Sequence, residues 1–232
     1  MHSETHFQRE LEKLKESLLH MAALVEKIIT DSVQSLVKRD SDLAQKTISG
    51  DGPINTLEIE IEETCLKLLA LRQPMAVDLR FITMAMKIIT DLERMGDQAV
   101  NIAERAVSLN QEPQLKPYID IPKMRSIAQR MTQDALDAFV RKDKRLARDV
   151  IIRDDEVDDL KQVVLHELAL FMVKDPATVT RAMKISFVAT YLERIADHAT
   201  NIAEMVIYLV DGTIIRHSYK NAGIGGIRMG EI

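Results

Sequence analysis

The stretch LERMGDQAVNIAE at residues 92–104 returns as LERIADHATNIAE at residues 192–204, with nine of its thirteen positions identical. A helix that turns about 100° per residue brings four oxygen-bearing side chains of this stretch into an arc of roughly 80°. In the first copy these are Glu93, Asp97, Asn101 and Glu104. The opposite side is apolar or small, so each copy predicts an amphipathic helix with an acidic stripe.

The polar positions of this stripe are the ones that have not changed between the copies. On a helix face that is merely solvated, most substitutions change the folding stability by less than about 0.5 kcal/mol. Such a face should therefore have diverged between the copies. The copies differ at Met95/Ile195, Gly96/Ala196, Gln98/His198 and Val100/Thr200. They share Glu93, Arg94, Asp97, Asn101 and Glu104. We infer that these five residues have a function beyond solvation.

Composition indicates an all-α protein that does not bind nucleic acid. The 232 residues include 8 glycines, 6 prolines and no tryptophan, and 29% are charged, which suits long amphipathic helices better than a β-sandwich. The formal net charge of −5 gives no overall electrostatic attraction to a polyanion.

The chain is expected to be cytoplasmic. Cys65 is the only cysteine, so no internal disulfide can form, and the charged start has no segment resembling a signal peptide. Apolar runs stay well short of the roughly 20 residues that a membrane-spanning helix needs. Any membrane association is therefore expected to be peripheral, through partners.

The duplication extends through most of the chain. DSVQSLVKRDSDLAQ at residues 31–45 aligns with DALDAFVRKDKRLAR at residues 134–148. We therefore predict two tandem pseudo-symmetric three-helix bundles with six long helices, a first unit at residues 1–112 and a second at residues 113–212. Residues 213–232 have little periodicity and are expected to form a C-terminal tail.

The apolar spacing and the turn residues predict where the six helices lie. The expected ranges are 4–37, 42–71 and 74–110 in the first unit, and 123–140, 144–173 and 175–211 in the second. Pro53 interrupts the second helix, and its counterpart in the second unit has no such breaker. A kink rather than a loop is therefore expected at Pro53.

Oxygen-bearing side chains on the second helix of each unit can join the stripe on the third. Clustered carboxylates repel unless a cation or protons compensate, and hard cations take several oxygen ligands at once. The candidate metal ligands are Asp51, Asn55, Glu93 and Asp97 in the first unit and Asp154, Asp158, Glu193 and Asp197 in the second. The alternative is that Arg94, Arg194, Arg105 or nearby lysines neutralise these acids as ion pairs.

The second unit is expected to bind its cation more tightly, because it has four carboxylates where the first unit has three and the amide of Asn55. A di-iron protein of the ferritin type would need Glu-x-x-His pairs, and the sequence has none. His166 and His198 are accordingly expected to be ordinary helix-surface residues. No catalytic residues are predicted, and the chain is not expected to be an enzyme.

The sequence resembles the PhoU family of phosphate-specific transport accessory proteins in three features. They are the doubled L-E-R-x-x-D-x-x-x-N-I-A-E, the upstream D-x-x-x-N/D, and the QPMAVDLRFI entry into the third helix at residues 73–82. The resemblance covers about residues 4 to 212 and implies two pseudo-symmetric three-helix bundles. Some relatives bind multinuclear iron or other metals at a Glu/Asp-x-x-x-Asp pattern, which here falls on Glu93/Asp97 and Glu193/Asp197.

This resemblance implies a cytoplasmic, dimeric negative regulator of phosphate uptake and phosphate-regulon signalling. It would connect the ATPase of a phosphate ABC transporter with a membrane sensor histidine kinase, and it would bind Fe, Mn, Mg or Zn ions. The replacement of a carboxylate by Asn55 departs from the pattern and would weaken the first metal site. The alternative function is a carboxylate-bridged metal oxidase or storage protein.

Overall fold

The computed structural model describes residues 6–212, and within them it contains helices and no strand. The helices are α1 (His6–Val37), α2 (Ser41–Ile48), α3 (Gly52–Arg72), α4 (Ala76–Asn110), α5 (Asp120–Arg141), α6 (Lys144–Lys174), the short 3-10 helix η1 (Pro176–Thr178) and α7 (Val179–Asp211). The predicted all-α class is confirmed. Residues 213–232 lie outside the described residues, and the boundary between residues 112 and 113 stays a prediction.

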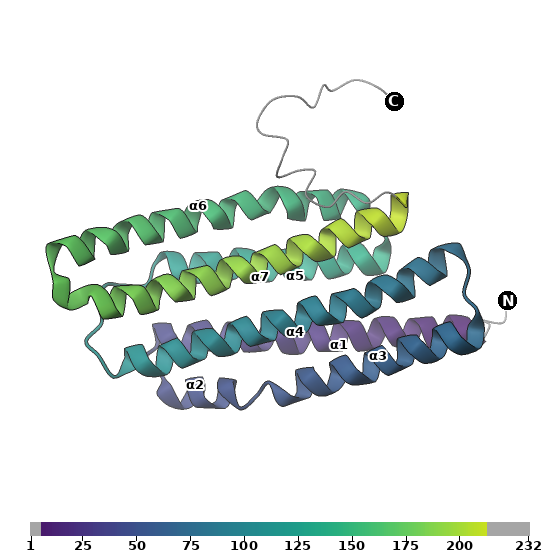
Figure 1. Cartoon of the computed structure of the whole chain (residues 1–232), viewed down its shortest axis with the longest axis horizontal. Helices are drawn as coiled ribbons and strands as arrows, with labels where there is room; N and C mark the ends of the chain where they lie inside the picture. Colours follow the sequence, from purple (N-terminus) through teal and green to yellow (C-terminus); the bar gives the residue numbers. More distant parts are fainter. Residues whose placement is uncertain (1–5, 213–232) are drawn as a thin grey trace, which may run out of the picture.

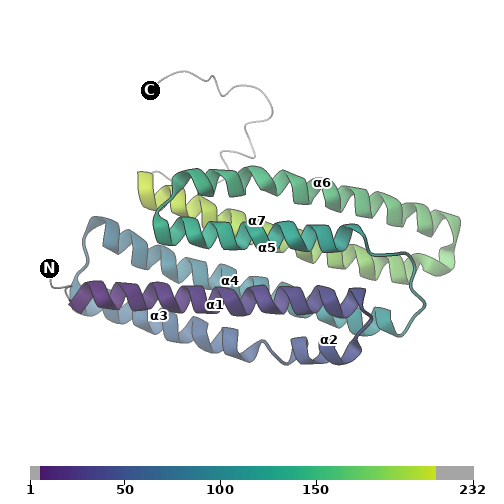
Figure 2. The same ribbon diagram turned by 180° about the vertical axis from the view of Figure 1, so that it is seen from behind.

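The long helices lie roughly along one axis, in two groups that follow the duplication (Figure 1). The first unit contains α1 to α4 and the second contains α5 to α7. Helices α4 and α7 lie side by side on one face, and α1 and α5 lie side by side on the other (Figure 2). The two units therefore share a long interface, with the two copies of the repeated stretch at its centre.

The apolar periodicity explains the core of each unit. On α4, the side chains of Leu92, Met95 and Ala99 are fully buried, and their spacing of three and four residues places them on one helix face. Phe81 of α4 stacks on Phe139 of α5 with ring centroids 4.7 Å apart. This buried aromatic pair connects the cores of the two units.

The turn after the first helix of each unit has the same geometry in both copies. Arg39 and Lys142 have φ values of 55° and 56°, in the left-handed region that few non-glycine residues adopt. The next residue caps the following helix: Asp40 accepts a hydrogen bond from Leu43 N, and Asp143 accepts from Arg145 N and Leu146 N. The two units thus share the structure of this turn as well as its sequence.

The expected kink at Pro53 is wrong, because the helix stops and restarts instead. Helix α2 ends at Ile48, and α3 begins at Gly52 with proline in its first turn. Pro53 cannot donate a backbone hydrogen bond and would clash with the preceding turn, whereas it is well tolerated at a helix start. The second unit lacks the breaker, so α6 is continuous. Asp51 consequently sits at the N-cap of α3 rather than within a helix.

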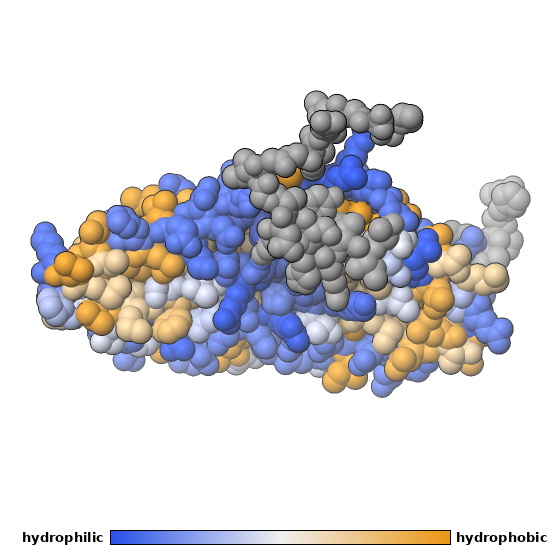
Figure 3. Space-filling model, turned by 45° about the horizontal axis from the view of Figure 1, so that its top comes forward, coloured by the Kyte–Doolittle hydropathy of each residue, from blue (hydrophilic) through white to orange (hydrophobic). Residues whose placement is uncertain are grey.

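Within residues 6–212 no helix is long and apolar enough to cross a membrane. On the face drawn in Figure 3, hydrophilic residues cover the middle and apolar residues gather toward both ends. Large apolar side chains are exposed where hairpins turn: Met75 is 81% exposed between α3 and α4, and Val173 is 84% exposed near the end of α6.

Candidate functional site

Helix α4 places Glu93 and Asp97 on the outside of the first unit. Leu92, Met95 and Ala99 anchor the opposite face in the core, so the two carboxylates project away from it. Glu93 is half-buried and Asp97 is exposed. In the second unit, Glu193 and Asp197 are likewise outside the core. Glu93 and Asp97 thus point away from the core, whereas the Glu193 side chain is mostly buried beside Lys161.

The helix break brings Asp51 to the same place. A Cβ added at Gly96 would lie 3.4 Å from Asp51 Oδ1, which shows how closely the start of α3 approaches α4. Asn55 Nδ2 donates a hydrogen bond of 2.9 Å to Asp51 Oδ2. Asp51 Oδ1 is buried and has no hydrogen-bond partner among the described residues. Asn55 thus holds one oxygen of Asp51, and the other is an unsatisfied acceptor.

The carboxylates of the first unit repel one another. Burial raises the pKa of Glu93, and the charges of Asp97, Glu58 and Asp51 raise it further against the opposing effect of Arg94. Burial and Asp51 also raise the pKa of Asp97. Repulsion between neighbouring carboxylates is what a bound cation or proton relieves. This acidic cluster, Asp51, Glu58, Glu93 and Asp97, has excess negative charge.

The second unit has a different electrostatic arrangement at the equivalent place. Lys161 Nζ donates to Glu193 Oε1 at 2.9 Å, and both side chains are mostly buried. Asp154 is buried and has a partner, while Asp158 is half-buried. Ion pairing, the alternative to metal binding, therefore applies to Glu193. The expected preference of a cation for the second unit loses its basis, because Lys161 already supplies the positive charge.

The predicted ligands are not yet arranged as a metal site. Within residues 6–212, no group of three or more His, Cys, Asp or Glu side chains is positioned to hold a metal ion. The oxygen ligands of the first unit nevertheless fit a hard cation, because its carboxylates repel one another and Asp51 Oδ1 accepts no hydrogen bond from residues 6–212. Surface side chains such as Asp97 change rotamer on the picosecond to nanosecond scale, so they can close on a cation.

One histidine has a role that the sequence did not predict. His198 was expected to be an ordinary surface residue, but its Nδ1 donates to Asp91 Oδ1 at 2.8 Å, and the two side chains are 15% and 11% exposed. Asn201 Nδ2 also donates to Asp91, at 3.3 Å. The signal available in the sequence was a lone carboxylate within the apolar run that ends at Leu92. These bonds join α4 of one unit to α7 of the other.

A hollow lies beside these bonds, between α4 and α7. Its lining comes from both copies of the repeated stretch: Arg94, Gln98, Arg194, Asp197, His198 and Asn201. Asp197, a predicted metal ligand, therefore lies at the interface between the units. The sequence does not predict that Arg94 and Arg194 meet, because this depends on how α4 packs on α7.

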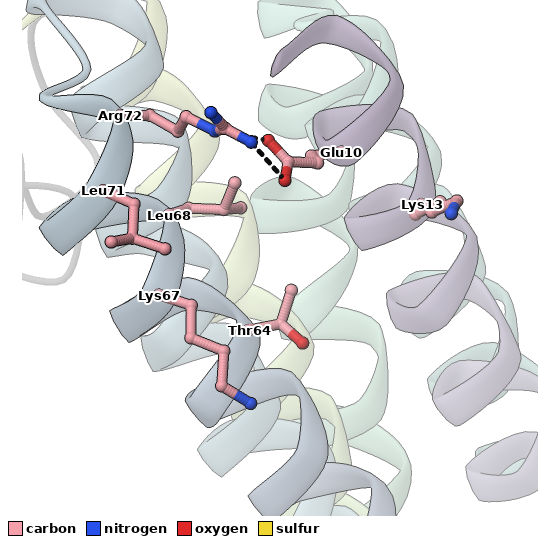
Figure 4. A pocket seen from close by; sticks show the side chains of 7 residues that line it. All are labelled: Glu10, Lys13, Thr64, Lys67, Leu68, Leu71 and Arg72. Carbon is pink, nitrogen blue, oxygen red and sulfur yellow. Dashed lines mark hydrogen bonds and ion pairs between the residues drawn. The ribbon is translucent and has the colours of Figure 1, made fainter. Parts of the chain in front are cut away.

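A second hollow lies between α1 and α3, and its charges are largely paired (Figure 4). Arg72 makes two hydrogen bonds to the carboxylate of Glu10, at 2.8 and 3.0 Å, and Lys67 pairs with Glu63 at 3.1 Å. Leu68 and Leu71 line the same hollow. The bidentate pair joins the two helices and gives this hollow a structural role.

Comparison with known proteins agrees with this architecture. A family model described as the PhoU domain matches the chain twice, at residues 18–106 and 121–206. The phosphate-specific transport system accessory protein PhoU homolog of Aquifex aeolicus is 46% identical over 211 residues, which cover 91% of this chain and 96% of that protein.

Two crystal structures have the same fold. PhoU from Pseudomonas aeruginosa has a TM-score of 0.85 and 44% identity, and the match covers 90% of this chain and all 100% of the other. The phosphate transport system regulatory protein PhoU from Streptococcus pneumoniae has a TM-score of 0.84 and 31% identity, covering 90% and 99% of the two chains. None of these three relatives is named as an oxidase or a storage protein, so the alternative function has no support from them.

Proposed function

The chain belongs to the PhoU family, and from that premise we propose that it is an accessory and regulatory protein of phosphate transport. In this proposal the protein is a cytoplasmic adaptor without enzymatic activity. It binds the ATPase of a phosphate ABC transporter and a sensor histidine kinase. When phosphate is plentiful, it reduces phosphate uptake and phosphate-regulon signalling.

The observation that carries the adaptor proposal is the acidic cluster on the first unit. Its carboxylates keep an unfavourable mutual repulsion, which a purely structural face would have no reason to retain. They lie on long, well-packed helices, so the surface they form is rigid at the backbone. A fixed patch of excess charge is suited to binding a cation or a basic partner surface.

A metal ion is the cofactor that we propose for this cluster. Asp51, Glu93 and Asp97 would hold it, with Asn55 orienting Asp51 through the bond of 2.9 Å. Mn²⁺, Mg²⁺, Fe or Zn²⁺ are the candidates, and the oxygen-only donor set favours the harder ions. The bound ion would offset part of the cluster's negative charge, and its remaining coordination positions would accept an oxygen of an acidic partner or a phosphate group.

The exposed apolar side chains support the proposal that partners dock on the ends of the bundles. Met75 and Val173 are among the most exposed large apolar residues, and each lies near the turn between the last two helices of its unit. Exposed apolar patches commonly mark protein contacts. We propose that such surfaces serve the transporter ATPase, the kinase or a second copy of the chain in a homodimer.

A co-purification experiment tests the adaptor function. The full chain is immobilised and exposed to the transporter ATPase and to the sensor kinase, with Mn²⁺ or with a chelator. We expect both partners to be retained and the variant Glu93→Gln/Asp97→Asn to retain less of at least one of them. The variant Asp155→Asn/Glu156→Gln removes the same charge from an exposed part of α6 and is the matched control.

The outcomes separate the parts of the proposal. If neither partner is retained under either condition, the adaptor function is wrong. If both are retained equally by the wild-type chain and by Glu93→Gln/Asp97→Asn, the adaptor function stands and the acidic cluster has no part in it.

A further inference from the structure

The hollow between α4 and α7 combines positively charged side chains from both units. The two helices run antiparallel, because Arg80 near the start of α4 donates to Leu209 O near the end of α7, and Arg105 lies over the ring of Phe187. The centres of the two repeated stretches therefore meet (Figure 1). Arg94 and Arg194, which occupy equivalent positions in the repeat, come to line one hollow.

The guanidinium groups of these two arginines can still donate hydrogen bonds to a ligand. Within residues 6–212, neither makes a hydrogen bond or an ion pair, and both side chains are exposed. A guanidinium group is always charged and presents a planar fork of donors that matches the oxygens of phosphate-type anions. Two such groups at one hollow are a binding arrangement for an oxyanion.

The polar floor of the hollow is held in place by Asp91. His198 Nδ1 and Asn201 Nδ2 both donate to Asp91 Oδ1, which fixes the imidazole ring and the amide at the edge of the hollow. Asp91 itself is buried, with 8% of its surface exposed, and it does not line the hollow. This preorganisation reduces the entropy lost when a ligand binds.

Two groups of the lining are acceptors, and they determine which oxyanion fits. Gln98 Oε1 is buried without a hydrogen-bond partner among the described residues, and an unsatisfied buried acceptor is costly. Asp197 adds the negative charge of a carboxylate to the lining. An oxyanion that carries a proton can donate to Gln98 Oε1 and has less negative charge, whereas a fully ionised one has no proton to donate and is repelled more strongly by the Asp197 carboxylate.

We propose that the hollow between α4 and α7 binds inorganic phosphate directly, through Arg94 and Arg194. In the bound state the guanidinium groups donate to the phosphate oxygens, and the P–OH group donates to Gln98 Oε1. Phosphate retains at least one proton at neutral pH and sulfate retains none, so the site selects phosphate over sulfate.

This site does not depend on the metal of the acidic cluster or on the adaptor function. The hollow is lined by α4 and α7 together, so a ligand there connects the two units directly. The second hollow, between α1 and α3, is a weaker candidate because Arg72 and Lys67 already have carboxylate partners. The site between the units has two arginines that make no such pair with any residue of the described range.

Equilibrium dialysis of the chelator-treated full chain against radiolabelled phosphate tests the proposal. We expect saturable binding of one phosphate per chain. Each charged hydrogen bond contributes enough that Arg94→Gln/Arg194→Gln should weaken binding by about tenfold or more. The control Arg145→Gln/Arg148→Gln removes two positive charges from exposed positions of α6 and should leave the affinity unchanged.

Competition by sulfate tests the selectivity. Sulfate should displace phosphate at least about tenfold less well than unlabelled phosphate does. Asp197→Asn should reduce this difference, because the amide can donate to sulfate. Circular dichroism checks that each variant is folded.

Three results would overturn the proposal. They are absence of saturable phosphate binding, phosphate binding only after Mn²⁺ is added, and unchanged binding by a folded Arg94→Gln/Arg194→Gln variant. None of these results bears on retention of the ATPase or the kinase, so failure of this site is distinguishable from failure of the adaptor function.

Discussion

Lys161 Nζ lies 2.9 Å from Glu193 Oε1, and the residue equivalent to Lys161 in the first unit is Glu58. In the second unit the lysine neutralises Glu193. In the first unit, Glu58 instead raises the pKa of Glu93. One charge reversal therefore makes the two copies of the stripe electrostatically different, although Glu93 and Glu193 are identical in the repeat.

The substitution Glu58→Lys should give the first unit an ion pair equivalent to that of Lys161 and Glu193 in the second. The new lysine can pair with Glu93, so the free energy of unfolding without metal should rise by about 0.5 kcal/mol. Urea unfolding in the presence of a chelator measures this change. Glu60→Lys, at an exposed position of α3, is the control and should have a smaller effect. A loss of stability in Glu58→Lys would contradict the ion pair.

The substitution Asp97→Asn should stabilise the protein at neutral pH but not in acid. The folded-state pKa of Asp97 is raised above its ordinary value of 3.8 by burial and by Asp51, so its ionisation destabilises the folded state. That penalty is absent below the ordinary pKa and grows as the pH rises through the raised pKa. The gain should be about 0.2–0.5 kcal/mol at pH 7, typical of a like-charge i,i+4 pair on a helix such as Glu93 and Asp97.

Urea unfolding at neutral pH and at a pH below 3.8 measures the effect of Asp97→Asn. Asp155→Asn, an exposed aspartate of α6, is the control. If the gain from Asp97→Asn were equal at both pH values, repulsion by ionised carboxylates would not be its cause.

The substitution Phe139→Ala should destabilise the whole chain. Phe139 is fully buried and stacks on Phe81 of the other unit, so truncation removes core contacts of both. Losses of about 3–5 kcal/mol are typical for such substitutions. Chemical unfolding should show a single transition at a lower midpoint. Phe187→Ala, whose ring is partly exposed, should cost less. Two separate transitions would show that the units unfold independently.

The substitution Asp91→Ala should weaken the interface between the units. It leaves the donors of His198 and Asn201 without their acceptor, which costs about 1–3 kcal/mol in a largely buried place. Asp91→Asn keeps an acceptor oxygen and should cost less. Thermal unfolding of the two variants measures the difference. Equal stability of Asp91→Ala and the wild-type chain would mean that these hydrogen bonds contribute nothing net.

The sequence predicted the helices and the outward face of the stripe because both follow from local periodicity. Helices α4 and α7 end at Asn110 and Asp211, as the apolar spacing and the following turn residues predicted. The helix break before Gly52 does not follow from the repeat, because α6 is continuous at the equivalent place. Pro53 disrupts the helical turn that precedes it, and this effect does not depend on the sequence of the second unit.

The contacts between elements could not be predicted in the same way. The sequence shows Lys161 on the second stripe, but only the packing of α6 on α7 shows that its ammonium reaches Glu193. The bonds of Asp91 to His198 and Asn201 join residues more than 100 positions apart. Such pairings depend on how two helices cross, which periodicity within each helix does not determine.

A Mn²⁺ titration of the apo-protein, followed by the loss of the free-ion electron paramagnetic resonance signal, tests the acidic cluster most directly. We expect Glu93→Gln/Asp97→Asn to remove the tighter binding phase and Glu193→Gln/Asp197→Asn to leave it. Lys161→Glu should add binding at the second unit, because it replaces the pairing ammonium with a carboxylate. If the tighter phase instead disappears with Glu193→Gln/Asp197→Asn, or survives in both variants, the first unit is not the cation site.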